Sequence, residues 1–288
     1  MPRGAPHETE FNARRLGAAL PPLMVKAERI AATVMMGSHG LRRAGAGETF
    51  WAYRDYTFGD STQRIDWRKS AKGDETLIRE NEWEAANTLW LWASLGPRME
   101  FKSHLATETK RHHAEILALA MAALALRAHE RVGLLGSGER ASYGRHMLSK
   151  LAQGLSQGSS NVLPQPNLIQ RRSSVLLVSD FLDEPAAIEK SLTALASSGM
   201  HGHLVQVTDP AEETLPYDGR MDFIGLDVAT RYRATRAEGL RKAYQEAFNA
   251  HRNALHDMAR KLGWSFNLHR TDQPLAATVL ALYQRLAL

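Results

Sequence analysis

The sequence contains no cysteine among its 288 residues. This absence excludes disulfide bonds, zinc–thiolate sites and thiol catalysis, and it says nothing about the cellular compartment. Long apolar runs are also lacking, because the longest, residues 116–126, is too short and too rich in alanine to span a bilayer. Charged residues stand near the N-terminus where a signal peptide needs an apolar core. We therefore expect a soluble cytoplasmic protein with no membrane span.

Motifs for nucleotide binding and catalysis are missing as well. The Gly-Ser-Gly segment 136–138 lacks the Lys-Ser/Thr pair of a phosphate-binding loop and indicates a turn after a strand. No Gly-x-Ser-x-Gly elbow is present. His112 and His113 are adjacent, so on a helix their rings point about 100° apart, which predicts surface histidines. His251 lies on an apolar helical stripe and is predicted to be hydrogen-bonded at the edge of the core rather than catalytic.

The composition is that of a globular protein, with 44% hydrophobic and 23% charged residues. The length suits one elaborated domain, or one domain with a small companion. A net charge of +5 would suit an anionic partner, but lysine and arginine are scattered along the chain. This distribution indicates a mildly basic surface, and a nucleic-acid partner is therefore not favoured.

From residue 89 onward, strand and helix patterns alternate along the chain. Strands are predicted at 89–93, 132–135, 175–178, 203–207 and 264–268, and the apolar composition of 89–93 and 175–178 predicts that these two are buried. Helical patterns lie between them at 107–129, 143–155, 185–199 and 240–262, and a final helix follows residue 272. This order predicts an α/β fold with a doubly wound, mostly parallel sheet covered by helices on both faces. Residues 211–233 are expected to form a surface excursion with short strands.

We divide the chain into two regions. Residues 1–85 are predicted to form N-terminal helices and a small β subdomain, and residues 86–288 the sheet domain. In the first region, a polar stretch at 47–72 alternates three aspartates with three arginines and separates them by large aromatics. Desolvating such charges is costly unless they are paired, which predicts a partly buried network of arginine–carboxylate contacts. Alternatively, Asp55, Asp60 and Asp66 could form a carboxylate cluster for metal-assisted hydrolysis, although the interleaved arginines favour a structural role.

The motifs of this stretch carry a resemblance to a known family. They are Gly47-Glu48-x-Phe50, Arg54-Asp55-Tyr56-x-x-Gly59-Asp60, Arg64, Asp66-Trp67 and Ser70-Ala71, followed downstream by Val178-Ser179-Asp180, Asp209-Pro210-x-Glu212 and Leu215-Pro216. From about residue 30 to the C-terminus, the chain resembles the family called domain of unknown function 58, whose members carry a von Willebrand factor A-like domain. The resemblance implies a doubly wound sheet, a gene located near genes for MoxR-type AAA+ ATPases, and a role in chaperone-like or assembly systems. It implies no known reaction.

A von Willebrand factor A domain usually holds a divalent cation at the carboxyl ends of its strands. Its ligands are an Asp-x-Ser-x-Ser loop after the first strand, a threonine from a later loop, and an aspartate after the fourth strand. In this chain Ser94, Gly96 and Arg98 stand at the three loop positions, while Asp180 keeps the last. The resemblance therefore implies a degenerate metal-site face without metal, made of Ser94, Gly96, Arg98, Ser179, Asp180 and Asp209.

Two interpretations of Arg98 remain open at this point. In the first, Arg98 reaches Asp180 and supplies the positive charge that a metal supplies elsewhere. In the second, Arg98 is a solvated loop residue.

Three functions from different classes follow. The first is a non-catalytic interaction or adaptor module that presents its strand-end face to a MoxR-type AAA+ ATPase or to the client of that ATPase, with no cofactor. The second is a nucleic-acid-binding protein, suggested by charge alone. The third is a metal-dependent hydrolase using the Asp55/Asp60/Asp66 cluster. The family-motif residues behind the first and third hypotheses are Glu48, Arg54, Asp55, Tyr56, Gly59, Asp60, Arg64, Asp66 and Trp67.

Overall fold

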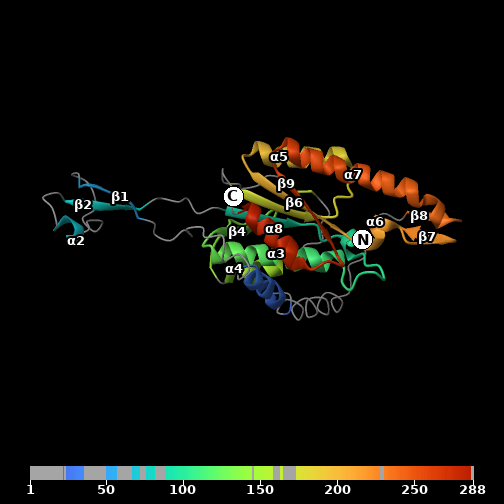
Figure 1. Cartoon of the computed structure of the whole chain (residues 1–288), viewed down its shortest axis with the longest axis horizontal. Coiled ribbons are helices and arrows are strands. Elements are labelled where there is room, and N and C mark those ends of the chain that lie inside the picture. The colour runs from blue at the N-terminus through green and yellow to red at the C-terminus, as the bar shows by residue number, and fades with distance from the viewer. Residues whose placement is uncertain are drawn as a thin grey trace, which may run out of the picture. The chain divides into compact units, whose positions relative to one another are not determined.

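The computed structural model describes Pro22 and residues 24–35, 50–56, 67–71, 76–81, 88–144, 146–157, 163–164, 173–227 and 230–286 (Figure 1). These residues form two compact units. The smaller unit contains the described residues between 50 and 81, and the larger contains residues 24–35 and 88–286. The helix at 24–35, which the sequence analysis placed in the N-terminal region, belongs to the larger unit because Ala27, Ala31 and Val34 lie in its core.

The smaller unit is built on a two-stranded antiparallel sheet. Strand β1 (Phe50–Asp55) pairs with β2 (Leu77–Asn81), with an irregularity in register between Phe50 and Ala52. The short helix α2 (Trp67–Ser70) lies between the two strands in sequence. The predicted small β-containing subdomain is therefore confirmed.

The larger unit contains a five-stranded sheet in the order β4-β3-β5-β6-β9. Every pair of neighbours in it is parallel. Its strands are β3 (Thr88–Ala93), β4 (Arg131–Leu134), β5 (Ser174–Ser179), β6 (His201–Thr208) and β9 (Ser265–Arg270). The predicted surface excursion contains an antiparallel hairpin of β7 (Met221–Ile224) and β8 (Arg231–Ala234). The predicted doubly wound, mostly parallel sheet is confirmed.

Helices cover both faces of this sheet, as Figure 1 shows. They are α3 (Lys110–Arg127), α4 (His146–Gln157), α5 (Pro185–Ser197), α6 (Pro210–Thr214), α7 (Arg241–Lys261) and α8 (Leu275–Leu286), with 3₁₀ turns at Pro97–Glu100 and Ala237–Leu240. Side chains of β3 alternate between two cores. Leu89 and Leu91 pack with α3, α4, α8 and helix 24–35, whereas Trp90 and Trp92 pack with α5 and α7. Burial on both faces explains why the central strands β3 and β5 are apolar runs.

Helix α3 is the central helix of the first core. Thr109 caps it by accepting a hydrogen bond from the backbone N–H of His112, as the sequence allowed. Nearly every side chain from His113 to Ala125 is buried, although the sequence indicated a single apolar face. The reason is that α3 is covered by the sheet, α4, α8 and helix 24–35 together. Across the described ranges, no helix is both long enough and apolar enough to cross a bilayer.

Gly202 of β6 lies directly against the buried indole of Trp264. A Cβ atom at this position would lie 1.8 Å from Cε3 of Trp264, which no side-chain rotation of the new residue could relieve. Gly202→Ala is therefore expected to lower the free energy of unfolding by about 1–3 kcal/mol, measured by urea denaturation. Gly239→Ala is the matched control, because its Cβ would have no neighbour within 4 Å. Equal stability of the two variants would contradict the prediction.

Candidate strand-end site

The carboxyl ends of the five parallel strands meet at one edge of the sheet, where ligands bind in open α/β folds. The loop after β3 begins at Ser94, whose backbone N–H donates to the carbonyl of Val178 on the neighbouring strand at 2.8 Å. Asp180 follows β5 and Asp209 follows β6. Both aspartates are almost completely buried. The site is therefore a set of buried carboxylates at the strand ends.

Lys110, the first residue of α3, is the cation closest to Asp180. Its Nζ donates to Oδ2 of Asp180 at 3.1 Å and to Oε1 of Glu212 at 2.5 Å. The lysine is 0% exposed, which is rare for this residue type unless it is paired. The sequence analysis missed Lys110. The sequence feature that could have indicated Lys110 is its position in the first turn of a predicted helix that starts at the strand-end edge of the sheet.

Glu212 and Asp209 are held by the short helix α6, which starts with a capping box. Asp209 Oδ1 accepts from the N–H of Ala211 at 2.8 Å, and Glu212 Oε2 accepts from the N–H of Asp209 at 2.9 Å. Asp209 Oδ2 accepts from the N–H of Ser103 at 2.9 Å, which ties the loop before α3 to α6. Burial raises the pKa of Glu212, and the charge of Lys110 opposes that rise.

Arg98 connects three loops around the same edge. Its Nη2 donates to Oδ1 of Asp183 at 2.8 Å and lies 3.7 Å from Oδ1 of Asp180, while Nε lies 3.4 Å from Oδ2 of Asp227. Burial alone would lower the pKa of Arg98, but the carboxylates of Asp180 and Asp183 raise it. The structure thus places Arg98 within ion-pair distance of Asp180, as the first interpretation proposed. The shorter contact to Asp180 belongs to Lys110.

The residues present do not fit a bound divalent cation. The ammonium of Lys110 is already within hydrogen-bonding distance of Asp180, and both carboxylate oxygens of Asp209 accept backbone N–H groups. Ser179 Oγ accepts from the N–H of Phe181, and Gly96 brings no side-chain ligand. Among the residues that the structure describes, no group of three or more histidine, aspartate or glutamate side chains could hold a metal ion.

Comparison with protein families identifies the chain. The model of the family described as "Protein of unknown function DUF58" matches residues 52–254. The chain belongs to this family. The match starts within β1 and ends within α7, so it contains Lys110, Asp180 and Glu212 of the DUF58 protein. The resemblance drawn from the polar stretch is confirmed.

Other comparisons add distant similarities. No curated protein matches the DUF58 protein. Among solved structures, it is similar to the conserved hypothetical protein BatB from Bacteroides thetaiotaomicron, with 9% identity, coverage of 70% of this chain and 99% of that chain, and a TM-score of 0.39. It is also similar to an aerotolerance-related membrane protein from Bacteroides fragilis NCTC 9343 carrying multiple mutations to serines, with 12% identity, the same coverage and a TM-score of 0.40.

The family-motif residues that the structure describes, Arg54, Asp55, Tyr56 and Trp67, lie in the smaller unit of the DUF58 protein. Arg54 and Asp55 are the last residues of β1, where the structure describes the backbone. Tyr56 is half-buried, and its N–H donates to the carbonyl of Thr76 at 2.7 Å. Trp67 starts α2 and is 67% exposed, so it is not packed inside a buried network. Glu48, Gly59, Asp60, Arg64 and Asp66 lie outside the described residues.

The histidines of the DUF58 protein correct one prediction and confirm another. His113 is buried rather than on the surface, because α3 is covered on all sides. Its Nδ1 lies 2.7 Å from Nε2 of His269, whose Nδ1 lies 2.9 Å from Oγ1 of Thr278. Burial lowers the pKa of both histidines to about 4. His251 is hydrogen-bonded to the carbonyl of Phe181 at 2.6 Å, as predicted.

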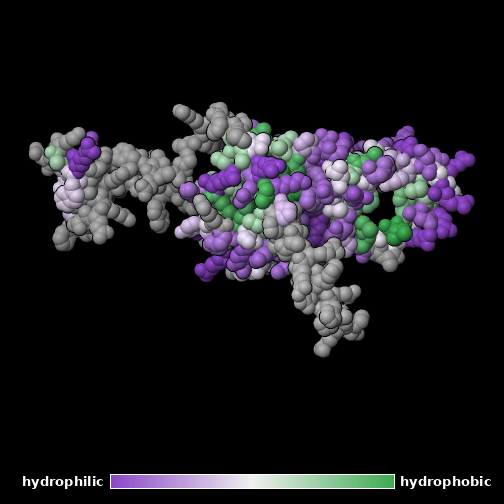
Figure 2. Space-filling model, turned by 90° about the horizontal axis from the view of Figure 1, so that it is seen from below, coloured by the Kyte–Doolittle hydropathy of each residue, from purple (hydrophilic) through white to green (hydrophobic). Residues whose placement is uncertain are grey.

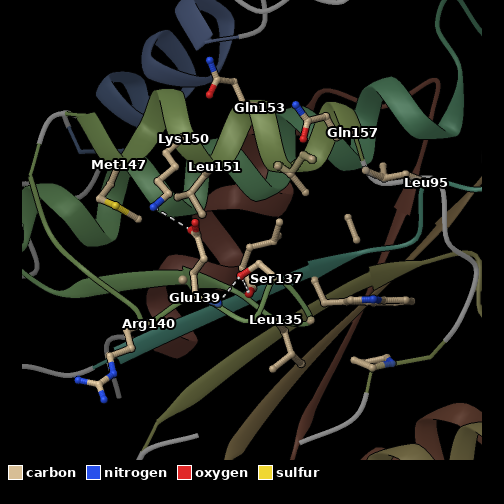
Figure 3. Close-up of a pocket in the computed structure, with 18 of the residues that line it drawn as sticks. Leu95, Leu135, Ser137, Glu139, Arg140, Met147, Lys150, Leu151, Gln153 and Gln157 are labelled. Carbon is tan, nitrogen blue, oxygen red and sulfur yellow. Dashed lines mark hydrogen bonds and ion pairs between the residues drawn. The ribbon is translucent and has the colours of Figure 1, made fainter. Parts of the chain in front are cut away.

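A groove of about 700 Å³ lies between α4 and the ends of β3 and β4 (Figure 3). Apolar side chains such as Leu135, Met147 and Leu151 line it, and an ion pair between Lys150 and Glu139 of 2.9 Å crosses it. The segment 136–138 at its edge is a turn with positive φ at both glycines, as predicted. Ser137 Oγ donates to the carbonyl of Leu134. The described residues that line the groove contain no paired nucleophile and base.

Proposed function

We propose that this DUF58 protein is a non-catalytic interaction module that binds a MoxR-type AAA+ ATPase through its strand-end face, in protein assembly or maturation. The observation that carries the proposal is a group of exposed aliphatic side chains beside Arg98. Leu182 is 38% exposed, Leu226 49% and Ile224 68%. Single exposed leucines are ordinary on a protein surface, but a group of exposed aliphatic side chains from the loop after β5 and from β7 and the segment after it is typical of interaction sites.

Ion pairs hold these side chains together. Arg98 contacts both Asp183 and Asp227, which directly follow Leu182 and Leu226 in sequence. Asp183 in the loop after β5 and Asp227 in the segment after β7 therefore contact the same guanidinium. Figure 2 shows hydrophobic surface among hydrophilic residues in the part of the larger unit where β7 and β8 lie. A preorganised apolar patch with a polar rim loses little conformational entropy when a partner binds.

The charged groups of the face support binding over catalysis. Lys110 is enclosed by two carboxylates, and Arg98 is shared among three, so each group has a structural partner. The choice of partner rests on family membership, because the motif resemblance implies that genes of this family lie near genes for MoxR-type ATPases. A purified ATPase of that type is the partner to test.

Ile224→Asp is expected to weaken binding of the purified ATPase about tenfold or more, because a carboxylate in the patch would have to be desolvated on binding. Val25→Asp is the matched control, since Val25 is 57% exposed on the helix at residues 24–35. Isothermal titration calorimetry measures both affinities. Equal losses in the two variants, or the absence of binding by the unmodified protein, would overturn the proposal.

A further inference from the structure

We infer that Asp180 and Glu212 form a cation site that the chain fills with its own ammonium group, that of Lys110. The inference concerns the chemistry of the site alone and does not depend on the proposed partner.

Each of the two carboxylates has one oxygen directed at the same point, the ammonium nitrogen of Lys110. Asp180 Oδ1 accepts from the N–H of Leu182 at 3.3 Å and faces Arg98, and Glu212 Oε2 accepts from the N–H of Asp209. The remaining oxygens, Asp180 Oδ2 and Glu212 Oε1, both contact Lys110 Nζ. One oxygen from each of two elements is thus reserved for a single cation.

The site has little access to solvent. Lys110 and Asp180 are 0% and 1% exposed, the Glu212 side chain is 15% exposed, and the Phe101 ring lies 5.9 Å from Nζ. Two carboxylates with so little solvent around them need a nearby positive charge to offset the cost of desolvating them. The lysine stem from the first turn of α3 delivers that charge from inside the protein.

Removing the lysine side chain should therefore change the occupant rather than abolish the site. Carboxylate oxygens are the ligands that hard divalent cations prefer, and truncation leaves space where the ammonium was. The unmodified protein, in contrast, needs no divalent ion to balance the negative charge of Asp180 and Glu212. Lys110→Ala is expected to gain a cation requirement that the unmodified protein does not have.

The experiment compares the unmodified protein, Lys110→Ala and the control Lys150→Ala, in which a half-exposed lysine paired with Glu139 is removed. Thermal denaturation and calorimetry are carried out with Mn²⁺ and with a chelator. Lys110→Ala is expected to bind Mn²⁺ about tenfold or more tightly than the other two proteins, with a rise in Tm that they lack. Adding Glu212→Gln to Lys110→Ala should remove the gain.

A folding defect in Lys110→Ala would not prevent the test of the cation site. If Lys110→Ala does not fold alone, it is refolded with Mn²⁺, with propylammonium or with chelator, and circular dichroism reports the folded fraction. Recovery with either cation and not with chelator supports the inference. No recovery with either cation overturns it, as does a folded Lys110→Ala whose response to Mn²⁺ equals that of Lys150→Ala. Because only the purified chain is used, failure here is distinguishable from failure of the proposed ATPase binding.

Discussion

Lys110→Met is expected to lower the free energy of unfolding by about 3–5 kcal/mol, because it removes the ion-pair partner of Glu212 and leaves Asp180 with only the longer contact to Arg98. Methionine keeps most of the apolar stem, so the loss reports on the charge rather than on a cavity. The carboxylates left behind are Asp180, which is 1% exposed, and Glu212, whose side chain is 15% exposed. Urea denaturation followed by circular dichroism measures the difference.

Two further variants make this prediction specific. Lys150→Met removes a lysine that is 50% exposed and paired with Glu139, and such surface pairs contribute about 0–1 kcal/mol. The double variant Lys110→Met with Glu212→Gln also removes the carboxylate charge of Glu212, which Lys110 no longer balances. It should therefore be more stable than Lys110→Met alone. A loss for Lys110→Met no larger than that for Lys150→Met would show that the buried ammonium is dispensable.

Acid is expected to destabilise the protein steeply between pH 6.5 and pH 4. Burial lowers the pKa of His113, His203 and His269 to about 4, below the ordinary value of 6.5. Between these values the unfolded chain binds protons that the folded chain does not, so protonation favours unfolding as the pH falls. Each histidine contributes a slope of up to about 1.4 kcal/mol per pH unit. Above pH 6.5 this contribution is constant and fully present.

Urea midpoints measured across this pH range test the assignment. His269→Gln removes one buried histidine and its contact with His113, and should flatten the pH dependence relative to the unmodified protein. His256→Gln is the control, because the side chain of His256 is 58% exposed. Since carboxylates titrate equally in both variants, the difference in slope belongs to the histidines. Parallel curves for the two variants would exclude His269 as a source of acid sensitivity.

Much of the larger unit could be predicted from local sequence. Strand β5 is an apolar run because both faces of the sheet are covered, so burial leaves a direct compositional signal. Pro185 and Gly199 mark the two ends of the α5 segment, because the first fits an initial helical turn and the second adopts a positive φ after the helix. The motifs of the polar stretch were sufficient to indicate the DUF58 family, which the family model confirms.

The burial of individual polar side chains could not be predicted in the same way. His113 was expected on the surface because the rings of adjacent helical residues such as His112 and His113 point about 100° apart. Helix 24–35 and α8 nevertheless close over α3 and leave only 7% of His113 exposed. The smaller unit adds a second case. Trp67 is a large aromatic in a stretch of dense charge, and it is nonetheless mostly exposed.

The sequence by itself determined the order of strands and helices in the larger unit and the family. Only the tertiary structure decided which cationic side chain makes the shortest ion pair with Asp180. Lys110 is separated from Asp180 by 70 positions and from Glu212 by 102, so no local pattern links them. Their contact exists because parallel strands and the α3 N-terminus bring these three residues to one buried edge, where low solvation makes pairing obligatory.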